Sequence, residues 1–350
     1  SQIDPRYLPG TDLLWASPEC THHSIARGRP REAGPDLFGE TLPAEAAERS
    51  RATMWDVPRF AEVHRYAAVV VENVVEVITW PPFRAWLMAM TSIGYEYRIV
   101  SLNSMHAQHL GDPAPQSRDR VYVVFWRRGN RAPALEEMQR PQAWCPECSA
   151  VVESRQAWKP GRTVGKYRTQ YIYICPDHRV PVEPAWLPVA SVIDWSVLGE
   201  RIGDRARPLA EKTRARIAAG IARYWLEPMV VPVEGRMGKR VSSVADPLRT
   251  QTTRHENALA CPPAGAARPV TDPVGTLTTE VSAETAAALV DECRFRMLTP
   301  AEVALAMAFP EEYLWLGTNR ERVRMAGGAV TPPAARDLIG AVVESLERVA

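Results

Sequence analysis

The sequence predicts an α/β fold built on a largely parallel, doubly wound sheet. Over the first third of the chain, short apolar runs typical of buried strands alternate with segments of helical composition. From about residue 132 prolines multiply and strands shorten, and helical periodicity returns at about residue 297. Alternating strands and helices indicate a parallel sheet, which presents its functional groups at the carboxyl ends of its strands.

Four apolar runs and two helices make up the predicted sheet domain. The strands are expected at residues 11–16, 67–74, 95–103 and 118–128. A helix is expected over residues 44–66 with a break near Pro58, because proline inside a helix removes a backbone hydrogen bond. A second helix is expected over residues 81–94, between a proline start and a glycine stop. Residues 27–43, rich in glycine and proline, predict a long loop.

The C-terminal part predicts two more helices and contains one internal echo. Residues 299–309 begin with Thr-Pro and have Glu302 in the first turn, and residues 332–349 form an amphipathic pattern. Two similar phrases, DPLRTQTTR at Asp246 and DPVGTLTTE at Asp272, indicate related turns within one domain. They are too short for a solenoid repeat.

The composition is that of a soluble globular protein. Of the 350 residues, 46% are hydrophobic and 24% are charged, with a net charge of +1. The sequence has no apolar run of membrane-spanning length and no signal-peptide pattern, so we expect no membrane segment and a cytoplasmic location. Cys261 and Cys293 lack partners at ligand spacing and are expected in the core. Basic residues gather in 118–131 and 201–223, where they can bind phosphate or simply form solvated faces.

Three cysteines and a histidine have the spacing of a structural zinc site. CPEC contains Cys145 and Cys148, and CPDH contains Cys175 and His178. Tetrahedral Zn²⁺ takes four such ligands, and each Cys-Pro turn directs two of them toward one point. No ligand position is left open, so the metal is expected to stabilise an insertion rather than to catalyse. The alternative is two unrelated buried pairs.

The stretch SPECTHHS, residues 17–24, follows the first predicted strand. It allows three interpretations: a metal site, a catalytic cysteine or a plain loop. His22 and His23 are adjacent and cannot easily face one ion together, and the chain holds a better zinc quartet further on. These observations disfavour a metal site and leave a catalytic cysteine and a plain loop open for this stretch.

Two further phrases place polar groups at strand ends. VVVENV ends an apolar strand with Glu72 and Asn73, where an α/β sheet presents its functional groups. PQSRDRVYVV places Gln116, Arg118 and Arg120 at alternate positions, and hence on one face. Arginines there can bind a phosphate or a base edge with paired donors. Taken singly, each phrase also fits a strand leaving the core or an exposed edge with scattered charges.

Taken together and in order, these motifs resemble those of the DNA (cytosine-5) methyltransferase family. The matching phrases are SPEC, ENV, GY…SLNSMHAQHLGDPAPQSRDRVYVV, RMLTPAEVALAMAFPEEY and GGAVTPPAARDLIG. The resemblance covers residues 11–126 and 294–346. Separate motifs in the right order are far more specific than any one of them.

The resemblance implies a methyltransferase with a Rossmann-like sheet that uses S-adenosylmethionine and acts on double-stranded DNA. Cys20 would add to carbon 6 of a cytosine flipped out of the duplex. Glu72 would keep ring nitrogen 3 protonated, while Arg120, with Arg118, would hold O2 and offset the developing charge. Carbon 5 would then take the methyl group, and loss of its proton would expel the cysteine.

This chain departs from the family pattern at the expected nucleophile. Where the family has Pro-Cys-Gln, this chain has Glu19, Cys20 and Thr21, and Ser24 matches the family's serine. A carboxylate beside the thiol raises the thiol pKa unless the carboxylate points away.

The cofactor side also departs from the pattern. By resemblance, Pro18, Gly328 and Val330 bind the cofactor, but GGAV stands where the family has Gly-Asn-Ala-Val, which removes an amide side chain. The family's Phe-x-Gly-x-Gly-Gly loop and its acidic ribose-binding residue do not occur in this chain. We therefore expect a sheet incomplete at its N-terminal side, with the missing part supplied by a longer protein or by a separate chain.

The resemblance divides the chain into four parts. These are a catalytic domain (1–131), a zinc-binding insertion (132–190), a smaller target recognition domain (191–292) and the C-terminal part of the catalytic domain (293–350). The basic stretch RARPLAEKTRARIAAGIARY is a candidate for following the DNA backbone. The candidate DNA-binding residues are Asn73, Gln116, Arg214, Arg216, Thr252 and Arg254. The polar phrases of the recognition domain equally fit structural turns.

Three functional hypotheses remain open at this stage. The leading one is a bacterial or phage DNA cytosine-5 methyltransferase, of the kind found in restriction-modification systems. The second is a DNA-binding pseudoenzyme or a subunit of a split methyltransferase. The third keeps the fold but changes the group transferred or uses RNA, and it is motivated by the altered residues Glu19, Thr21 and Gly328.

Overall fold

The computed structural model describes residues 3–19, 44–224, 227–234, 238–263 and 282–347. The chain packs as two compact units. The first unit contains Ser1–Pro113, Arg118–Ala185 and Pro332–Ala350, and the second contains Ala114–Ser117 and Trp186–Thr331. This is a division by packing, and the four-part division by function stays a prediction.

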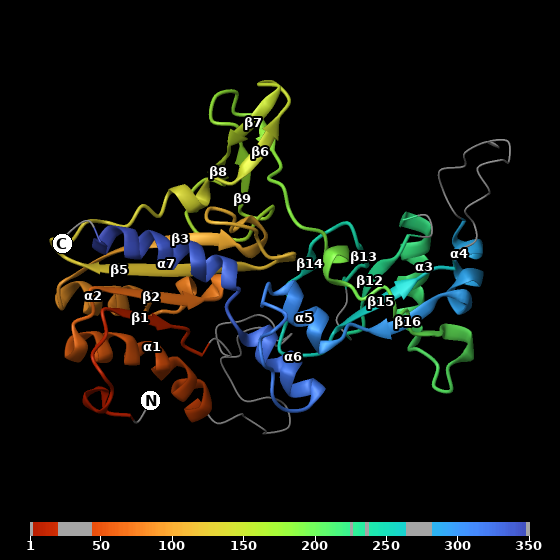
Figure 1. The fold of residues 1–350 in the computed structure, drawn as a ribbon, viewed down its shortest axis with the longest axis horizontal. Helices are drawn as coiled ribbons and strands as arrows, with labels where there is room; N and C mark the ends of the chain where they lie inside the picture. Colours follow the sequence, from red (N-terminus) through yellow and green to blue (C-terminus); the bar gives the residue numbers. More distant parts are fainter. Residues whose placement is uncertain (1–2, 20–43, 225–226, 235–237, 264–281, 348–350) are drawn as a thin grey trace. The chain divides into compact units, whose positions relative to one another are not determined.

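A four-stranded sheet forms the centre of the first unit. Its strands are β1 (Leu13–Ala16), β2 (Ala68–Asn73), β3 (Tyr95–Asn103) and β5 (Asp119–Arg127). Their order is β1-β2-β5-β3 (Figure 1). β1 pairs with β2 in parallel, whereas β5 runs antiparallel to both of its neighbours.

The expectation of a largely parallel sheet therefore holds for one neighbouring pair only. β1, β2 and β3 run in the same direction, and β5 lies between β2 and β3 in the opposite one. The connection from β3 to β5 contains only the short 3-10 helix η4 (Ser104–His106) and the two-residue strand β4 (Gln116–Ser117). A parallel return usually crosses over through an α-helix, which this connection lacks. As a result, β5 begins at the edge where β2 and β3 end.

One face of the sheet is covered by α1 (Ala44–His64) and α2 (Phe83–Ser92), together with η3 (Val75–Thr79). Alternate residues of β2 and β5 enter this core because successive strand side chains point to opposite faces. The main contributors are Met54, Val57, Val69, Val71, Trp86, Met90, Val121, Val123 and Phe125.

The first helix continues through Pro58, contrary to the predicted break. A proline at this position has no N–H to donate to the carbonyl of Met54, four residues earlier. That carbonyl accepts a 2.7 Å hydrogen bond from the indole Nε1–H of Trp86 instead. Trp86 is fully buried, so α2 supplies the donor that the proline removes from α1.

The C-terminal helix α7 (Pro332–Glu347) belongs to the same unit. Its buried Asp337 accepts the backbone N–H groups of His109 and Leu110 at 3.0 and 3.1 Å. The neighbouring Arg336 donates to the carbonyl oxygens of Ala107 and Gly111. These hydrogen bonds attach α7 to the connection that follows β3. Another 3-10 helix, η1 (Pro5–Tyr7), precedes β1.

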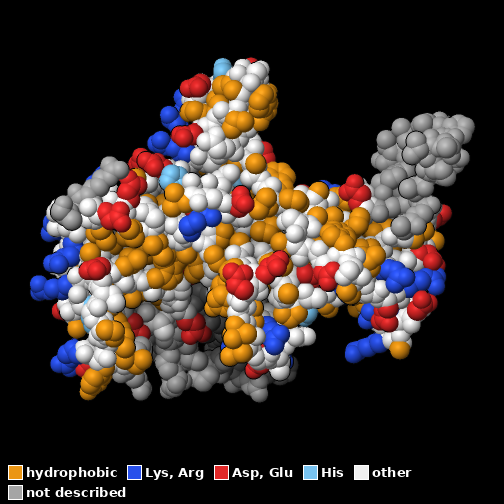
Figure 2. Space-filling model, in the orientation of Figure 1, with side chains coloured by type: hydrophobic (Ala, Val, Ile, Leu, Met, Phe, Trp, Pro, Cys, Tyr) orange, Lys and Arg blue, Asp and Glu red, His pale blue; other side chains and the backbone are white. Residues whose placement is uncertain are grey.

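A β-rich insertion extends from the sheet beyond β3 (Figure 1). It comprises η5 (Glu137–Gln139), β6 (Gln142–Cys145), β7 (Ala150–Glu153), β8 (Arg155–Trp158), β9 (Tyr171–Ile174) and β10 (Pro181–Val182). β6 pairs with β7, and β9 pairs with both β8 and β10. Hydrophobic side chains gather on its surface (Figure 2), including the cross-strand neighbours Trp144 and Val151.

The second unit is built on an antiparallel sheet ordered β11-β16-β15-β12-β13. The strands of this sheet are β11 (Glu200–Arg201), β12 (Met229–Pro232), β13 (Ser242–Ser243), β15 (Asn257–Cys261) and β16 (Arg294–Met297). A separate two-stranded sheet pairs β4 (Gln116–Ser117) with β14 (Leu248–Arg249). The 3-10 helices of the unit include η6 (Val189–Val192), η7 (Ile202–Asp204) and η8 (Val290–Glu292). Its helices are α3 (Glu211–Tyr224), α4 (Ala283–Leu289), α5 (Pro300–Ala306) and α6 (Asn319–Gly328). Cys261 and Cys293 are buried, as expected for core residues.

Helix α5 begins as its sequence predicts. Thr299 and Glu302 form a reciprocal capping box, in which each side chain accepts the other residue's backbone N–H at 3.2 and 2.7 Å. Glu302 also pairs with Arg296 at 2.6 Å, which joins the helix start to β16. Within the described residues, no helix is both long and apolar enough to span a bilayer.

Two adjacent glycines at the end of α6 have different environments. A Cβ atom at Gly327 would lie 1.9 Å from the carbonyl oxygen of Thr252, so the two backbones approach too closely for any side chain. A Cβ atom at Gly328 would meet only the Thr253 methyl group, at 3.8 Å. The Gly328 position therefore has room for a Cβ atom, although the GGAV motif has no amide side chain there.

The Pro58–Trp86 arrangement predicts a coupled effect on stability. Trp86→Phe should lower the free energy of unfolding by about 1–3 kcal/mol, because it leaves the buried Met54 carbonyl without its donor. In a Pro58→Ala background the new backbone amide can bond that carbonyl, so the same substitution should cost about 1 kcal/mol less. Urea unfolding of the four proteins measures the coupling. Strictly additive effects would show that the indole does not replace the lost bond.

The glycine pair predicts opposite tolerance at neighbouring positions. Gly327→Ala should destabilise the second unit despite the better helix propensity of alanine, which contributes about 1 kcal/mol. Gly328→Asn should change the free energy of unfolding by less than about 1 kcal/mol, because its Cβ site is open. Thermal unfolding of both variants compares them directly. Equal stability of the two would contradict the close approach at Thr252.

Candidate active site and metal centre

Glu72 and Arg120 form an ion pair at the edge where β2 ends and β5 begins. The Nε atom of Arg120 lies 2.7 Å from Oε1 of Glu72, and the two side chains are 13% and 10% exposed. Glu72 lies opposite Tyr122 in the antiparallel register, and Arg120 is two residues before Tyr122, so both side chains share one face. Sequence analysis predicted both residues and their strands but not their direct contact.

The surroundings of this pair are held by backbone groups and by neutral side chains. The guanidinium of Arg120 also donates to the carbonyl oxygen of Asp119 at 2.8 Å. Burial, and then the negative charge of Glu72, raise the pKa of Tyr122 above its usual value. Tyr122 therefore remains a neutral phenol beside the pair.

Arg118 is 2% exposed, so its side chain lies within the protein rather than on its surface. Its backbone N–H donates to Oδ1 of Asn103 at 2.9 Å, and its carbonyl accepts the N–H of Ser104 at 3.0 Å. The same oxygen of Asn103 accepts the N–H of Met105 at 3.2 Å and caps η4. Asn103 organises the start of β5, and sequence reasoning missed it although the quoted SLN phrase contains it.

Asn73 holds the segment that leads to Cys20. Its Nδ2 atom donates to the carbonyl oxygen of Pro18 at 3.2 Å, and its Oδ1 atom accepts the N–H of Val74 at 2.8 Å. Cys20 itself, and the predicted loop 27–43, lie outside the described residues. The structure thus brings Asn73 and Pro18 together two residues before the predicted nucleophile.

Glu19, the residue that departs from the family pattern, is exposed. Its backbone N–H donates to Oγ1 of Thr53 on α1 at 3.0 Å. α1 thus holds the backbone of the segment immediately before Cys20.

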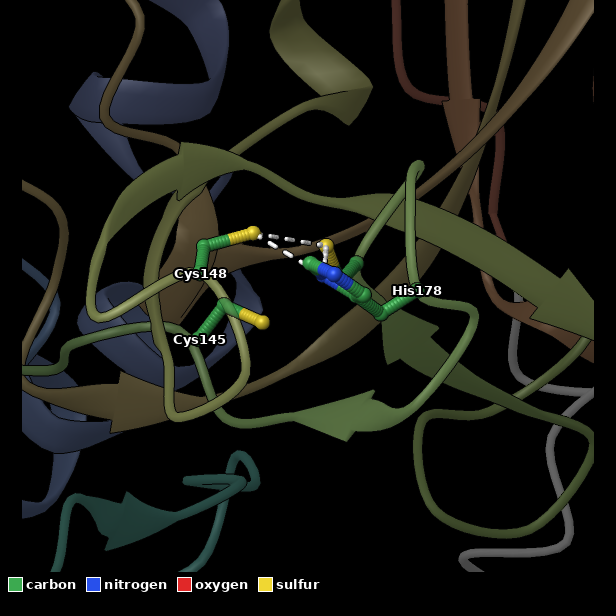
Figure 3. Close-up of side chains that lie close together, drawn as sticks. Cys145, Cys148 and His178 are labelled. Atoms are coloured by element: carbon green, nitrogen blue, oxygen red, sulfur yellow. Dashed lines mark hydrogen bonds between the residues drawn. The ribbon is translucent and has the colours of Figure 1, made fainter.

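The four predicted metal ligands come together in the insertion. The ligand atoms of Cys145, Cys148, Cys175 and His178 all lie within 4.8 Å of one another. Figure 3 shows Cys145 and Cys148 from the β6–β7 turn and His178 from the β9–β10 turn, with their side chains close together. The sulfur atoms of Cys148 and Cys175 are 3.7 Å apart, and Nδ1 of His178 lies 3.1 and 3.9 Å from them.

These distances and donor types fit a tetrahedral metal ion. Ligands at about 2.3 Å from one Zn²⁺ ion lie about 3.8 Å apart. Backbone N–H groups of His178 and Asp177 lower the pKa of the Cys175 thiol to about 6, with burial acting in the opposite direction. Burial, followed by the neighbouring cysteines, raises the pKa of Cys148 to about 12. Thiols this crowded do not all ionise without a cation between them.

The arginines predicted to follow DNA have partners inside the second unit. Both guanidinium NH groups of Arg214 donate to the Asp291 carboxylate, at 2.6 and 3.0 Å. Arg216 donates to the carbonyl oxygens of Pro232 and Glu234 at 2.5 and 2.8 Å. Both side chains therefore link α3 to its neighbours, and their contact with DNA stays a prediction.

The turn that contains Thr252 and Arg254 is organised by a buried amide. Gln251 donates through Nε2 to the carbonyl oxygens of Thr252 and Arg254 at 2.8 and 2.7 Å. Its backbone N–H donates to Oε1 of Gln116 at 3.2 Å. Arg254 is exposed at the tip of the turn.

Gln116 belongs to the second compact unit and Arg118 to the first, and their placement on one face stays a prediction. Within the second unit Gln116 is fully buried, and its Nε2 atom has no partner among the described residues. The cofactor candidates Gly328 and Val330 also belong to the second unit, whereas Pro18 belongs to the first. Sequence proximity predicted these residues but not this division.

The first part of the chain matches a known protein family. Residues 1–154 match the model of the C-5 cytosine-specific DNA methylase family. A comparison with curated protein sequences finds no match.

Solved structures of methyltransferases resemble the chain at low sequence identity. A mutant of DNMT2 from Spodoptera frugiperda has a TM-score of 0.50 at 14% identity, covering 98% of this chain and 83% of that one. Dnmt2 from S. pombe has a TM-score of 0.45 at 15% identity, covering 96% and 79%. A protein described as a prophage DNA modification methyltransferase from E. coli has a TM-score of 0.43 at 12% identity, covering 99% and 86%.

The Spodoptera structure indicates a methyltransferase-like fold and nothing finer. The family model rests on sequence and covers the strands that carry Glu72 and Arg120. It confirms the resemblance drawn from the motifs: residues 1–154 match the C-5 cytosine-specific DNA methylase family.

Proposed function

We propose that this chain transfers a methyl group to carbon 5 of a cytosine in DNA, with Cys20 as the nucleophile. The observation that carries the proposal is the 2.7 Å contact between Glu72 and Arg120 at the strand edge. This pair puts a carboxyl group and a guanidinium side by side, and they complement a cytosine ring protonated at N3, which offers N3–H as a donor and O2 as an acceptor.

The chemistry follows from the poor nucleophilicity of carbon 5. A thiolate added to carbon 6 converts the ring into an enamine that can attack an electrophile. The Glu72 carboxyl group holds a proton at N3 as the ring gains electrons, and Arg120 stabilises the charge that develops at O2. Because both side chains are nearly buried, little water competes for these contacts.

The segment before Cys20 is the second support. Asn73 fixes the carbonyl oxygen of Pro18, and Thr53 fixes the N–H of Glu19. Both contacts hold the backbone, so the thiol of Cys20 can be aimed while Glu19 is exposed to solvent. A carboxylate in water raises a neighbouring thiol pKa much less than a buried one, because water screens its charge.

S-adenosylmethionine, which the family uses, supplies an electrophilic methyl group when bound. Pro18 follows β1 at the carboxyl end of a sheet strand, which is where open α/β sheets bind ligands. Gly328 and Val330 are the further candidates, with open space at the Gly328 Cβ position. The family's glycine-rich loop does not occur in this chain, so a further segment or chain that supplies it is part of the proposal.

DNA is the proposed substrate, with the cytosine turned out of the duplex, because neither face of carbon 6 is accessible inside a base stack. The exposed Arg254 is the best candidate among the described residues for DNA contact in the second unit. Thiolate addition to carbon 6 would also occur if the substrate were RNA or if another group were transferred. A protein that only binds DNA would not carry out this addition.

The base chemistry can be tested without the cofactor. Thiolate addition to carbon 6 lets carbon 5 take a proton from water, so DNA tritiated at cytosine carbon 5 should release its label. Cys20→Ala should abolish this release, and Glu72→Gln should slow it about 100- to 10,000-fold. Glu62→Gln, an exposed change on α1, is the control and should have no effect.

Three results separate the alternatives. Binding of DNA with no label release from any cytosine would leave a binding module and overturn the proposal. Release from RNA but not DNA would change the substrate. Mass spectrometry of the modified nucleoside, with the cofactor and the missing loop supplied, identifies the transferred group.

We also propose that the cluster of Cys145, Cys148, Cys175 and His178 binds one structural Zn²⁺ ion. Three thiols and an imidazole within 4.8 Å are the donor set that zinc prefers, and all four tetrahedral positions are filled by protein. The ion would join the β6–β7 turn to the β9–β10 turn.

Metal analysis tests this assignment. The purified chain should contain one zinc ion, and Cys148→Ser should lose it, whereas Glu147→Gln in the same turn should keep it. Cobalt substitution should give the visible bands of a tetrahedral thiolate site. Zinc bound equally by the Cys148→Ser variant would contradict the assignment, and an iron spectrum in the purified protein would replace zinc by iron.

A further inference from the structure

The loop between β8 and β9 is one of the places where the insertion contacts the sheet, alongside η5 and β8. We propose that residues Gly165–Tyr167 of this loop position the Glu72–Arg120 pair, with Asp119 receiving the contact and the metal cluster holding the loop's supporting strands. The catalytic consequence rests on the function proposed above. The contact between the insertion and the sheet does not.

Asp119 is the point where the insertion meets the arginine. Its Oδ1 atom accepts the backbone N–H of Tyr167 at 3.0 Å and Nδ2 of Asn103 at 3.1 Å. Its own carbonyl oxygen accepts the Arg120 guanidinium at 2.8 Å. One residue therefore has its side chain held by the insertion and its backbone in contact with Arg120.

Two neighbouring residues of the loop hold the other strands of the site. Lys166 forms a 2.6 Å ion pair with Glu76, in the 3-10 helix that follows the Glu72–Asn73 strand end. The N–H of Gly165 donates to Oγ of Ser101 on β3 at 3.3 Å. Consecutive loop residues thus contact β3, β5 and the segment after β2, which surround the pair.

The loop is shaped by contacts that lead to β9. The N–H of Lys166 donates to Oε1 of Gln170 at 2.6 Å, and the N–H of Arg168 donates to the carbonyl of Tyr171 at 2.8 Å. A Cβ atom at Gly165 would lie 2.4 Å from Cβ of Gln170, so only glycine fits there. Cys175 immediately follows β9, which puts a metal ligand one strand away from the loop.

Aromatic packing makes this connection rigid. The His106 ring meets the rings of Tyr167 and Tyr173 edge-on, with centroids 4.7 and 5.0 Å apart. Burial lowers the pKa of His106 to about 3, so the ring stays neutral within this packing. Tyr173 lies on β9 and Tyr167 in the loop, so a shift of β9 is transmitted to the residue that contacts Asp119.

The partial burial of Asp119 explains why the contact matters. Loss of water raises the pKa of this carboxyl to about 6, and the hydrogen bonds from Tyr167 and Asn103 act in the opposite direction. A partly buried carboxylate that loses a donor pays a desolvation cost and tends to turn toward water. That movement would carry the Asp119 backbone, and with it the acceptor of Arg120.

A matched pair of variants separates positioning from general stability. Both donors reach the same oxygen of Asp119, so Asp119→Asn keeps an acceptor there, whereas Asp119→Ala removes it. Lys159→Gln, an exposed change in the same loop, is the control. All variants are made in the full chain.

The first measurement is amide exchange at Tyr167. With zinc bound, Asp119→Ala should speed exchange of the Tyr167 N–H about tenfold, and Asp119→Asn and Lys159→Gln should not. Chelation of the metal in the wild-type chain should speed it similarly. Unchanged protection of this amide in Asp119→Ala, or after chelation, would overturn the proposal.

The second measurement is the rate of label release from carbon 5. Asp119→Ala should lower kcat about 10- to 100-fold with little change in KM, because the variant misplaces the Glu72–Arg120 pair and leaves DNA binding intact. Asp119→Asn should restore the rate. An equal decrease in both variants would assign the effect to charge and overturn positioning. If the wild-type chain releases no label while the exchange results hold, the proposed function fails and the structural contact stands.

Discussion

The site depends on a buried ion pair between two strands that run in opposite directions. Removing two charges from water costs several kcal/mol per ion, and attraction offsets this only when the geometry is good and further hydrogen bonds are made. Glu72 and Arg120 meet this condition because the antiparallel register of β2 and β5 sets their spacing. The carbonyl of Asp119 supplies a further acceptor. A slip of one residue in this register would move both side chains to the other face.

Short polar side chains connect this pair to the segments around it. Asn73 joins the end of β2 to the segment before Cys20, and Asn103 joins the end of β3 to the start of β5. Asparagine suits both places because one side chain offers a donor and an acceptor, and its short stem leaves little freedom to lose. The insertion adds a third connection through Tyr167. The strand ends are therefore fixed from three directions.

Sequence patterns predicted the four strands, the position of Glu72 and Arg120 at strand ends, and the metal quartet, because each depends on local periodicity or spacing. The patterns failed where distant contacts decide. Pro58 stays inside a helix because Trp86, far along the chain, supplies the missing donor. The role of Asp119 was not predicted, because nothing nearby in the sequence marks the Tyr167 amide as its partner.

All four proposed metal ligands lie between residues 145 and 178, so binding an ion would close a short loop of chain. The entropy lost on closing a loop grows only slowly with its length, and contacts between near neighbours form quickly. The antiparallel strands of the insertion are likewise joined by local turns. The insertion therefore has the local contacts of an element that can fold without the rest of the chain. The four-stranded sheet, by contrast, combines strands that are distant in the sequence and packs in one unit with the C-terminal helix α7.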